Sequence, residues 1–412
     1  MRRTDTIIIG GGQAGLAMSR CLADEGIEHV VLERGRVAER WKSERWNSLR
    51  LLSPRWHTRL PGCAYHGPDP DGFMTMPEII SYLERYARSF GAPIHDETNV
   101  LGVERSDDGY RVRTDRGSWN APSVVIATGH CDVPFVPRAA MGLSKQVHQL
   151  VPSQYKQADQ LPDGGVLVVG ASASGIQLAQ EIHRSGRPVT LAVGRHIRMP
   201  RRYRGRDIAW WLEASGILGE RAEHAFDLAS ARRQPSLQLV GTPDHRTIDL
   251  GVLQEEGIRL MGRIDAASGA RVRLRDDLAS NIHSAERKLD RVLGRIDAFV
   301  EETRMEASAP DRRPPIEVRS APGELDLRAA GIASVLWATG FRRNYRWLNV
   351  PVLDARGEII HDGGVTPAAG LYALGLNFQR TRKSSFIDGV GDDARIVAEH
   401  IARRFQHSSI AA

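Results

Sequence analysis

The sequence has little cysteine: Cys21, Cys63 and Cys131 are the three in 412 residues. They are odd in number and far apart, and no C-x-x-C pair exists, which argues against a disulfide framework, a zinc cluster and a dithiol relay. The sequence also lacks an apolar run near the ~18–20 residues of a membrane-spanning helix. The first apolar run, Thr6–Ile9, is too short for the core of a signal peptide, so we expect a cytoplasmic protein without a membrane span.

Aromatic residues are also sparse, at 6%, but 41% of the chain is hydrophobic and 26% is charged, which is typical of a globular protein with a sizeable core. A length of 412 residues indicates two or three domains. The formal net charge is +6, yet no zinc-finger, helix-turn-helix or RNA-binding motif is present, so we expect no nucleic-acid partner. An anionic cofactor or substrate explains the charge more simply. We find no metal-ligating cluster and assign no catalytic side chain.

Two stretches of the chain have the order strand, glycine loop, helix, strand. The first comprises residues 6–9, 10–15, 16–25 and 30–32, and the second comprises 166–169, 170–175, 176–185 and 189–193. Each is a βαβ unit, the beginning of a parallel sheet. The sequence therefore predicts the α/β class with two Rossmann-like dinucleotide-binding domains.

The first glycine loop meets every context of a dinucleotide site, because it follows a strand, opens a helix and has an acid after the next strand. Gly10 permits the tight turn, Gly12 lets the backbone approach a pyrophosphate, and Gly15 lets the helix pack close to the strand. Glu33 can accept hydrogen bonds from a ribose hydroxyl and would repel a 2′-phosphate. The loop thus favours FAD or NAD over NADP.

The second loop has Ser172 in place of the middle glycine, and no acid follows its second strand. Arg195 follows that strand instead, and arginine there suits the 2′-phosphate of NADPH by charge and by its forked geometry. Arg198 and Arg201 are the alternative readers of this phosphate, whereas we expect Arg204 and Arg206 to lie on a solvated surface.

Outside these units we expect helices at 76–90, 281–302 and 392–405 and strands at 100–112, 124–127, 334–338 and 371–374. Apolar residues three and four apart predict that the helix at 281–302 packs on its own domain; a coiled-coil partner is the alternative.

These features resemble the flavin-containing monooxygenase superfamily, and more closely its bacterial NAD(P)- and FAD-dependent members. The supporting stretches are both glycine loops, Glu33, Arg40-Trp41, Leu60-Pro61-Gly62, Ala127-Thr128-Gly129-His130 and Ala338-Thr339-Gly340-Phe341. Together the motifs and the resemblance indicate these cofactor-binding residues: Gly10, Gly12, Gln13, Ala14, Gly15, Glu33, Arg34, Arg40, Trp41, Gly129, Gly170, Ser172, Ala173, Ser174, Gly175, Arg195, Ala338, Thr339, Gly340 and Gly375.

The chain departs from that superfamily at its identifying run, F-x-G-x-x-x-H-x-x-x-[FY]-[KR]. Gly142 and Ser144 stand where Phe and Gly are expected, and His148 is followed by Tyr155-Lys156 three positions late. Ala173 replaces an asparagine that many members carry. The departures concern the oxygenation chemistry, not the two nucleotide sites.

The resemblance implies an NADPH domain inserted into the FAD domain. We expect residues 1–160 and 326–412 to form the FAD domain and 161–325 the NADPH domain, with a helical insert at about 203–315. We expect the segments Leu52-Ser53-Pro54, Leu60-Pro61-Gly62 and Arg382–Phe386 to lie near the flavin ring.

The implied reaction is reduction of FAD by NADPH and oxygenation of a small organic substrate by molecular oxygen, through a C4a-peroxyflavin. The flavin performs this chemistry, which is consistent with the lack of an obvious catalytic constellation. Two alternatives stay open: an NADPH-dependent flavin reductase or oxidase acting on a quinone or protein acceptor, and a non-catalytic nucleotide-sensing module. A homodimer also stays open.

Overall fold

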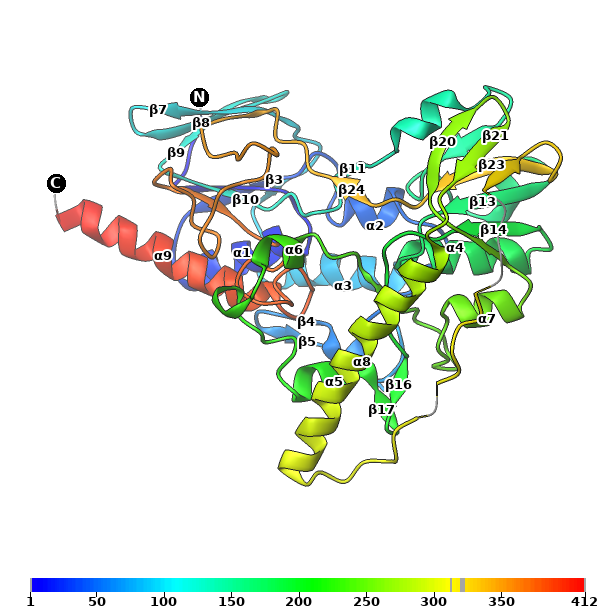
Figure 1. Ribbon diagram of the computed structural model, residues 1–412. Coiled ribbons are helices and arrows are strands. Elements are labelled where there is room, and N and C mark those ends of the chain that lie inside the picture. The colour runs from blue at the N-terminus through cyan, green and yellow to red at the C-terminus, as the bar shows by residue number, and fades with distance from the viewer. Residues whose placement is uncertain (1, 312, 319–322, 411–412) are drawn as a thin grey trace.

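The computed structural model describes residues 2–311, 313–318 and 323–410 and shows two lobes, each built on a five-stranded parallel sheet (Figure 1). Both chain termini lie in the first lobe, which confirms that the chain returns to the domain from which it started. The α/β class expected from the two βαβ units is thus present in both halves.

The first sheet has the order β26-β10-β2-β3-β6, with all neighbours parallel. Its strands are β2 (Thr6–Ile9), β3 (His29–Leu32), β6 (Ile94–His95), β10 (Ser123–Ile126) and β26 (Leu371–Ala373). Ile7 and Ile8 at its centre are fully buried. Such strands, covered on both faces, are continuous apolar runs, as the sequence is here. Helix α1 (Gln13–Asp24) packs on this sheet, and α9 (Val390–Ile410) packs on α1.

The second sheet repeats this plan with the order β12-β23-β13-β14-β19, again all parallel. Its strands are β12 (His148–Leu150), β13 (Gly165–Val169), β14 (Val189–Ala192), β19 (Arg259–Met261) and β23 (Ile332–Trp337). Helix α4 (Ala173–Arg184) follows β13 as α1 follows β2. The sheet therefore takes strands from both sides of the expected boundaries at 160 and 326, because β12 and β23 pair within it.

The chain crosses between the lobes along one antiparallel ribbon, formed by β11 (Val133–Pro134) and β24 (Phe341–Arg342). Of the two Ala-Thr-Gly stretches, 338–340 lies directly before β24, and 127–129 lies shortly before β11. The backbone N–H of Phe135 donates to the carbonyl of Gly340 at 2.8 Å, which ties the two crossings together.

Each lobe also carries a second sheet built around antiparallel hairpins. The first has the order β1-β9-β8-β7-β25, from β1 (Arg2–Arg3), β7 (Val100–Ser106), β8 (Gly109–Thr114), β9 (Gly117–Ala121) and β25 (Leu348–Asn349). Its outer strands β1 and β25 pair parallel with the hairpins. The second joins β20 (Ile264–Ser268), β21 (Arg271–Leu274) and β22 (Glu324–Asp326). The single strand expected at 100–112 is therefore two, because the chain turns at Asp107-Asp108.

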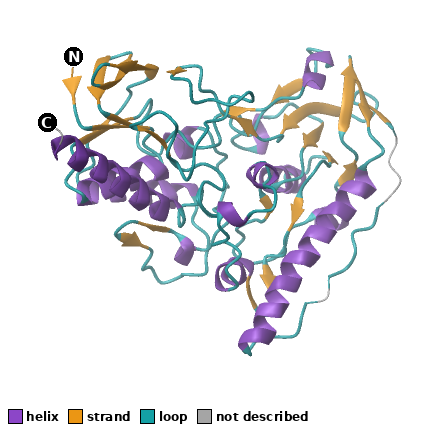
Figure 2. Cartoon of the chain, turned by 60° about the vertical axis from the view of Figure 1, so that its left-hand side comes forward, coloured by secondary structure: helices purple, strands orange, loops and turns teal. Residues whose placement is uncertain are grey.

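The segment between 203 and 315 is only partly helical. It holds α5 (Ile208–Ala214), α6 (Leu228–Arg232), α7 (Leu250–Glu255) and α8 (Leu278–Thr303), but also β19 of the main sheet. Helix α8 runs diagonally along the second lobe (Figure 2). Its apolar face is buried on its own domain, against residues such as Trp211 and Leu212 of α5, so no coiled-coil partner is needed.

The remaining elements are short, apart from α3 (Met76–Ser89) near the centre of the molecule. They are α2 (Glu39–Ser43), β4 (Arg59–Leu60), β5 (Cys63–Ala64), β15 (Ile197–Arg198), β16 (Arg202–Tyr203), β17 (Arg206–Asp207) and β18 (Leu237–Gln238). Among the described residues, every helix is too short or too polar to span a lipid bilayer.

Candidate functional site

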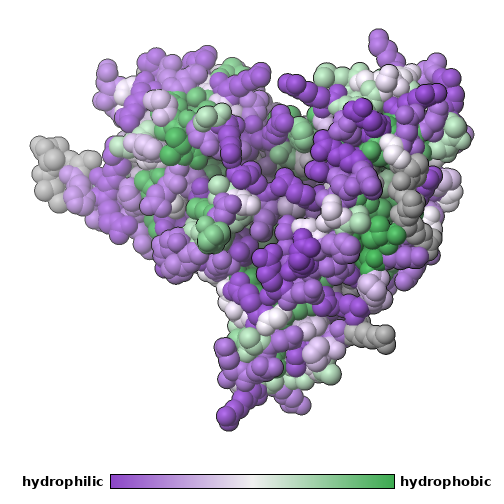
Figure 3. Space-filling view, viewed as in Figure 1, coloured by the Kyte–Doolittle hydropathy of each residue, from purple (hydrophilic) through white to green (hydrophobic). Residues whose placement is uncertain are grey.

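A cavity of about 1690 Å³ lies between the two lobes, and both glycine loops open into it. The ends of β2 and β3, the loops that follow β13, β14 and β23, the crossing ribbon and helix α8 contribute to its walls. The space-filling view shows a notch between the lobes on a face that is mainly hydrophilic (Figure 3). One continuous cavity can therefore accept two dinucleotides from opposite lobes.

The first loop is folded as the fingerprint requires. Gly10 has φ +111°, and a Cβ there would lie 2.7 Å from the carbonyl oxygen of Ala127. A Cβ on Gly15 would lie 1.8 Å from the oxygen of Gly10, so the helix passes the strand end too closely for any side chain. A Cβ on Gly12 would meet no atom within 4 Å, which leaves a cradle at the N-terminus of α1 that suits a pyrophosphate.

Glu33 lies beside this loop at the end of β3. Its carboxylate accepts hydrogen bonds from the backbone N–H groups of Gly11 at 2.6 Å and Gly35 at 2.9 Å. These two bonds hold the carboxylate in place at the cavity wall, where a ribose can reach it.

The second loop repeats this backbone closely. Gly170 has φ +108°, and a Cβ on Gly175 would lie 1.8 Å from the oxygen of Gly170. Ser172 caps α4 with φ −85° and ψ −173°, as Gly12 caps α1 with −84° and −170°. The Ser172 side chain makes no capping bond and lines the cavity.

A cluster of cations lines the cavity beyond the second loop. Arg195 is exposed there, and Lys288 and Arg291 of α8 face the same cavity. No ion pair to an acid is present for these three side chains among the described residues. Burial and the nearby charges of Arg195 and Arg291 lower the pKa of Lys288. The cluster is therefore suited to an anion such as a phosphate.

Two other arginines after β14, Arg198 and Arg201, form buried ion pairs. Arg198 is buried in ion pairs with Asp249 and Glu286, and Arg201, only 1% exposed, pairs with Asp207 at 2.6 Å. Because neither lines the cavity, neither is available as the alternative reader of a phosphate.

Of the two arginines that we expected on the solvated surface, Arg206 is exposed and Arg204 is half-buried. Arg204 is half-buried and pairs with Asp297 of α8 at 2.7 Å. Arg206 is exposed and lies over the ring of Trp210 at 4.1 Å.

The structure brings the predicted site residues together. All of the predicted cofactor-binding residues line the cavity except Gly15 and Gly175, which support the loops from behind. Of the segments expected near a flavin ring, Leu52, Ser53, Arg382, Ser385 and Phe386 line it, but Leu60-Pro61-Gly62 does not. The loops, Glu33 and the cation cluster fit FAD in the first lobe and a nicotinamide dinucleotide in the second; individual contacts stay predictions.

The two arginines after β3 and in α2 anchor this wall of the cavity. Arg40 pairs with Asp132 at 2.5 Å, and Arg34 reaches Glu44 at 3.4 Å. Asp132 in turn accepts a bond from the backbone N–H of Asn344 near the crossing ribbon. Arg40 therefore ties α2 to the junction of the two lobes.

The displaced Tyr155-Lys156 pair has a structural role. The Tyr155 hydroxyl donates to Glu181 of α4 at 2.8 Å. The Lys156 ammonium donates to the carbonyls of Ser43, the last residue of α2, and of Arg45 just after it. The pair therefore fastens the linker to both lobes and does not line the cavity.

Cys131 is the one cysteine of the three that lines the cavity. Burial raises the pKa of its thiol, but the adjacent His130, together with Arg45 and Arg40, outweighs burial and lowers the pKa to about 7. Part of Cys131 is therefore thiolate at neutral pH.

The sequence analysis did not predict three side chains that line this site: Lys288, Arg291 and His57. Lys288 and Arg291 stand on the polar face of a helix that was expected, but polar faces of helices are normally solvated. His57 lines the cavity although its side chain is only 2% exposed, and it contacts Asp388 far along the chain. No pattern in the neighbouring sequence indicates that Lys288, Arg291 or His57 lines a cavity.

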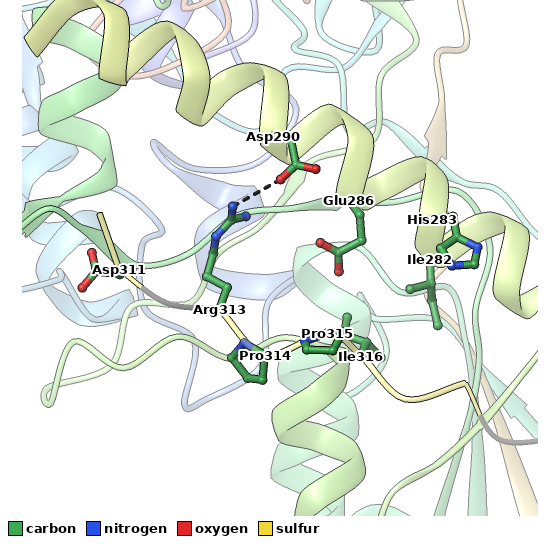
Figure 4. A pocket seen from close by; sticks show the side chains of 9 residues that line it. All are labelled: Ile282, His283, Glu286, Asp290, Asp311, Arg313, Pro314, Pro315 and Ile316. Carbon is green, nitrogen blue, oxygen red and sulfur yellow. Dashed lines mark hydrogen bonds and ion pairs between the residues drawn. The ribbon is translucent and has the colours of Figure 1, made fainter. Parts of the chain in front are cut away.

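A second cavity, of about 310 Å³, lies away from the glycine loops, between α8 and the stretch 311–316 (Figure 4). Arg313 reaches across it to Asp290 at 3.2 Å. None of the cofactor-binding residues lines it.

Comparisons with known proteins agree with this geometry. Residues 7–213 match the family described as "Pyridine nucleotide-disulphide oxidoreductase". An "Uncharacterized oxidoreductase CzcO-like" of Geobacillus kaustophilus is 33% identical over 96% of this chain and 98% of its own length. The "Probable indole-3-pyruvate monooxygenase YUCCA1" of Arabidopsis thaliana is 33% identical over 43% of this chain and 44% of its length. Among solved structures, a flavin-containing monooxygenase from Stenotrophomonas maltophilia has a TM-score of 0.68 at 18% identity, covering 98% of this chain and 99% of that one, which confirms the fold class.

Proposed function

Because the chain belongs to the pyridine nucleotide-disulphide oxidoreductase family, we propose that it is an NADPH-dependent, FAD-containing monooxygenase of a small organic substrate. The resemblance to the flavin-containing monooxygenase superfamily is confirmed, as is the expectation of a flavin-dependent oxidoreductase. The choice of NADPH, the oxygenation and the substrate are the parts that we propose.

The single observation that carries the proposal is that two dinucleotide loops open into one cavity that contains one cysteine. A dithiol relay needs two cysteines with Cα atoms about 4.4–6.8 Å apart. Cys21 and Cys63 lie outside the cavity. Electrons from the nicotinamide therefore pass to an acceptor other than a protein dithiol, and oxygen is the simplest.

The residues of the chain act by binding and orientation. The first loop and Glu33 hold the FAD dinucleotide, and the second loop holds the pyrophosphate of NADPH at the N-terminus of α4. FAD, when bound, accepts two electrons from the nicotinamide and passes them to oxygen. Two dinucleotides bound between the lobes would displace water from the place where these groups meet.

The preference for NADPH over NADH rests on the cation cluster of Arg195, Lys288 and Arg291. A 2′-phosphate placed there would meet three positive groups without an acidic partner. At the first loop, Glu33 would repel the same phosphate. The two sites therefore select different dinucleotides by the charge that follows the second strand of each unit.

The far end of the cavity suggests an apolar substrate. Leu212 of α5 and Ile217 and Leu218 after it line the cavity, with Val292 of α8. The indole-3-pyruvate of the partial relative's name combines an aromatic ring with a carboxylate, and such a compound is a reasonable first candidate. A cytoplasmic location and a homodimer stay predictions, checked by cell fractionation and by size-exclusion chromatography.

The test measures the incorporation of ¹⁸O from ¹⁸O₂ into the product. The purified protein, supplied with NADPH and a panel of aromatic 2-oxo acids, amines and thioethers, should incorporate one ¹⁸O atom per NADPH oxidised into one substrate class. Stoichiometric hydrogen peroxide with every compound would contradict monooxygenation and leave an oxidase. No NADPH oxidation at all would leave the nucleotide-sensing module.

The cavity-lining thiolate favours one second candidate, a reductase of low-molecular-weight disulfides. A Cys131 thiolate could attack such a disulfide and be regenerated by electrons from the flavin. Replacing all three cysteines by serine decides between the two functions. We expect NADPH oxidation to persist, and its loss in a folded, flavin-loaded variant would support the reductase.

A further inference from the structure

A group of five charged and polar side chains lies at one wall of the cavity, drawn from three distant segments of the chain. His57 and Asp388 are its buried centre, whereas Arg59 and Glu213 are partly exposed. His57 and Arg59 come from the segment before β5, Glu213 from α5, and Lys383 and Asp388 from the loop before α9. The Nε2 atom of His57 lies 3.1 Å from Asp388 and 3.7 Å from Glu213. No motif predicted this group.

The charges of this group are balanced around Asp388, whose side chain is 3% exposed. Arg59 pairs with one of its oxygens, and Lys383 lies 3.1 Å from the other. Burial opposes ionisation, but His57, Arg59 and Lys383 outweigh it and hold the pKa of Asp388 well below its usual range. The carboxylate is therefore a permanent anion in contact with the imidazole.

Each of the three segments also lines the cavity. His57 does so with Leu52 and Ser53, α5 contributes Ala209 and Leu212, and the loop before α9 contributes Ser385 and Phe386. His57 therefore stands where the predicted flavin-facing segment meets the apolar end of the cavity. The ring of Trp56 lies beside it, at 4.9 Å between centroids.

Glu213 connects this group to the outside. Its side chain is 34% exposed, yet its Oε2 atom is buried without a hydrogen-bond partner and lies toward His57. Its other oxygen accepts from Lys383 at 3.1 Å. The carboxylate thus reaches from solvent to within 3.7 Å of the imidazole.

The proposed function, on which this inference rests, consumes a proton in the cavity between the lobes. NADPH, oxygen, one proton and the substrate give NADP⁺, oxygenated substrate and water; without substrate, NADPH, oxygen and one proton give NADP⁺ and hydrogen peroxide. Either way, one proton per NADPH must reach an oxygen atom in that cavity. A cavity-facing imidazole beside a fixed carboxylate is the group suited to carry it.

We propose that His57 is the proton donor of the reaction, with Asp388 as its positioning residue and Glu213 as its link to solvent. The N–H bond of the imidazolium breaks as an O–H bond forms on the oxygen that leaves as water or peroxide. His57 then recovers a proton from solvent by way of Glu213. Asp388 keeps the ring oriented and stabilises its charged form. Arg59 and Lys383 balance the two carboxylates, so the three ligating groups, although within 4.8 Å of one another, carry no excess negative charge for a metal ion.

The first test measures the imidazole directly, by NMR on protein that carries ¹³Cε1-labelled histidine. The His57 signal, assigned by its loss in His57→Gln, should change position in Asp388→Asn, because the carboxylate 3.1 Å from the imidazole is gone. A His57 signal that is unchanged in Asp388→Asn overturns the proposal whether or not the protein is a monooxygenase.

The second test separates the two half-reactions in a stopped-flow spectrometer, with NADPH and oxygen as the only reactants. In His57→Gln, the flavin should be reduced by NADPH at the wild-type rate, and its reoxidation by oxygen should slow about 100-fold and lose its dependence on pH. The matched control is His66→Gln, since His66 is exposed and outside the cavity. Reoxidation within twofold of the wild-type rate overturns the proposal. If His57→Gln loses its flavin, Asp388→Asn is measured instead, with the same slowing of reoxidation expected and the same limit for overturning the proposal.

A wild-type protein that binds no FAD or is not reduced by NADPH contradicts the proposed function instead. The NMR comparison of wild type with Asp388→Asn then tests the contact of His57 with Asp388 alone.

Discussion

The two glycine loops of this protein have nearly the same backbone and opposite electrostatics. Gly10 and Gly170 have φ +111° and +108°, and both helix-packing glycines would place a Cβ 1.8 Å from a carbonyl oxygen. The difference lies one strand later, where Glu33 is held by two backbone N–H groups and Arg195 faces the cavity among cations. The loop geometry therefore suits a dinucleotide in both lobes, and under the proposed function the residue after the second strand decides which dinucleotide binds.

The largest effects should come from the glycines that both loops share. Gly15→Ala and Gly175→Ala each force a Cβ into a backbone oxygen, which costs at least the roughly 1–3 kcal/mol of overpacking and displaces the helix. We expect Gly15→Ala to lose FAD and Gly175→Ala to keep FAD but lose reduction by NADPH. Flavin absorbance and anaerobic reduction measure the two. Equal loss of FAD in both variants would show that the lobes do not fold independently.

Substitutions at the middle residue of each loop, Gly12 and Ser172, should distinguish loss of the cofactor from misfolding. Gly12 has φ −84° and an open Cβ position, so Gly12→Val should fold and still exclude the pyrophosphate of FAD, which gives colourless protein. Ser172→Val should stay yellow and raise the KM for NADPH. Gly294→Val on α8, where a Cβ also meets nothing within 4 Å, is the control. A fully flavin-loaded Gly12→Val variant would mean that FAD binds elsewhere.

The electrostatic difference is tested at Arg195. Arg195→Glu replaces attraction by repulsion at the 2′-phosphate and should reduce the NADPH-to-NADH ratio of kcat/KM about 10- to 150-fold, the equivalent of about 1.5–3 kcal/mol. Lys288→Glu should act in the same direction and Arg202→Glu, exposed but outside the cavity, should not. An unchanged NADPH-to-NADH ratio in both Arg195→Glu and Lys288→Glu would show that the 2′-phosphate does not bind at this cluster.

The smallest effect concerns a group on α9, the long helix that packs on α1, whereas the helix that packs on α4 is the short α7. Burial raises the pKa of Asp393, in the first turn of α9, to about 6. The folded state therefore prefers the protonated carboxyl, and its stability falls as the pH rises from about 4 through 6. Asp393→Asn should raise the free energy of unfolding by at most about 2–3 kcal/mol above pH 6 and change little at pH 4. Melting temperatures across this range measure it; equal shifts at both pH values would contradict the assignment.

The sequence by itself determined the parts of this protein that are local. Two βαβ units, their glycine loops, and the charge after each second strand follow from residues within about 30 positions of one another, and the fold confirms both units. The 281–302 helix was likewise predicted from its apolar spacing and is α8 with ends extended by a few residues.

Tertiary structure decided everything that depends on distant segments. The assignment of β12 and β23 to the second sheet, the use of Lys288 and Arg291 at the cavity, and the exclusion of Arg198 and Arg201 by buried ion pairs are all long-range pairings. The His57 group is the extreme case, because His57 and Asp388 are over 300 residues apart and meet only when the chain returns to the first lobe. Short-range periodicity carries no information about such meetings, since burial and charge pairing are settled by which surfaces the folded chain brings together.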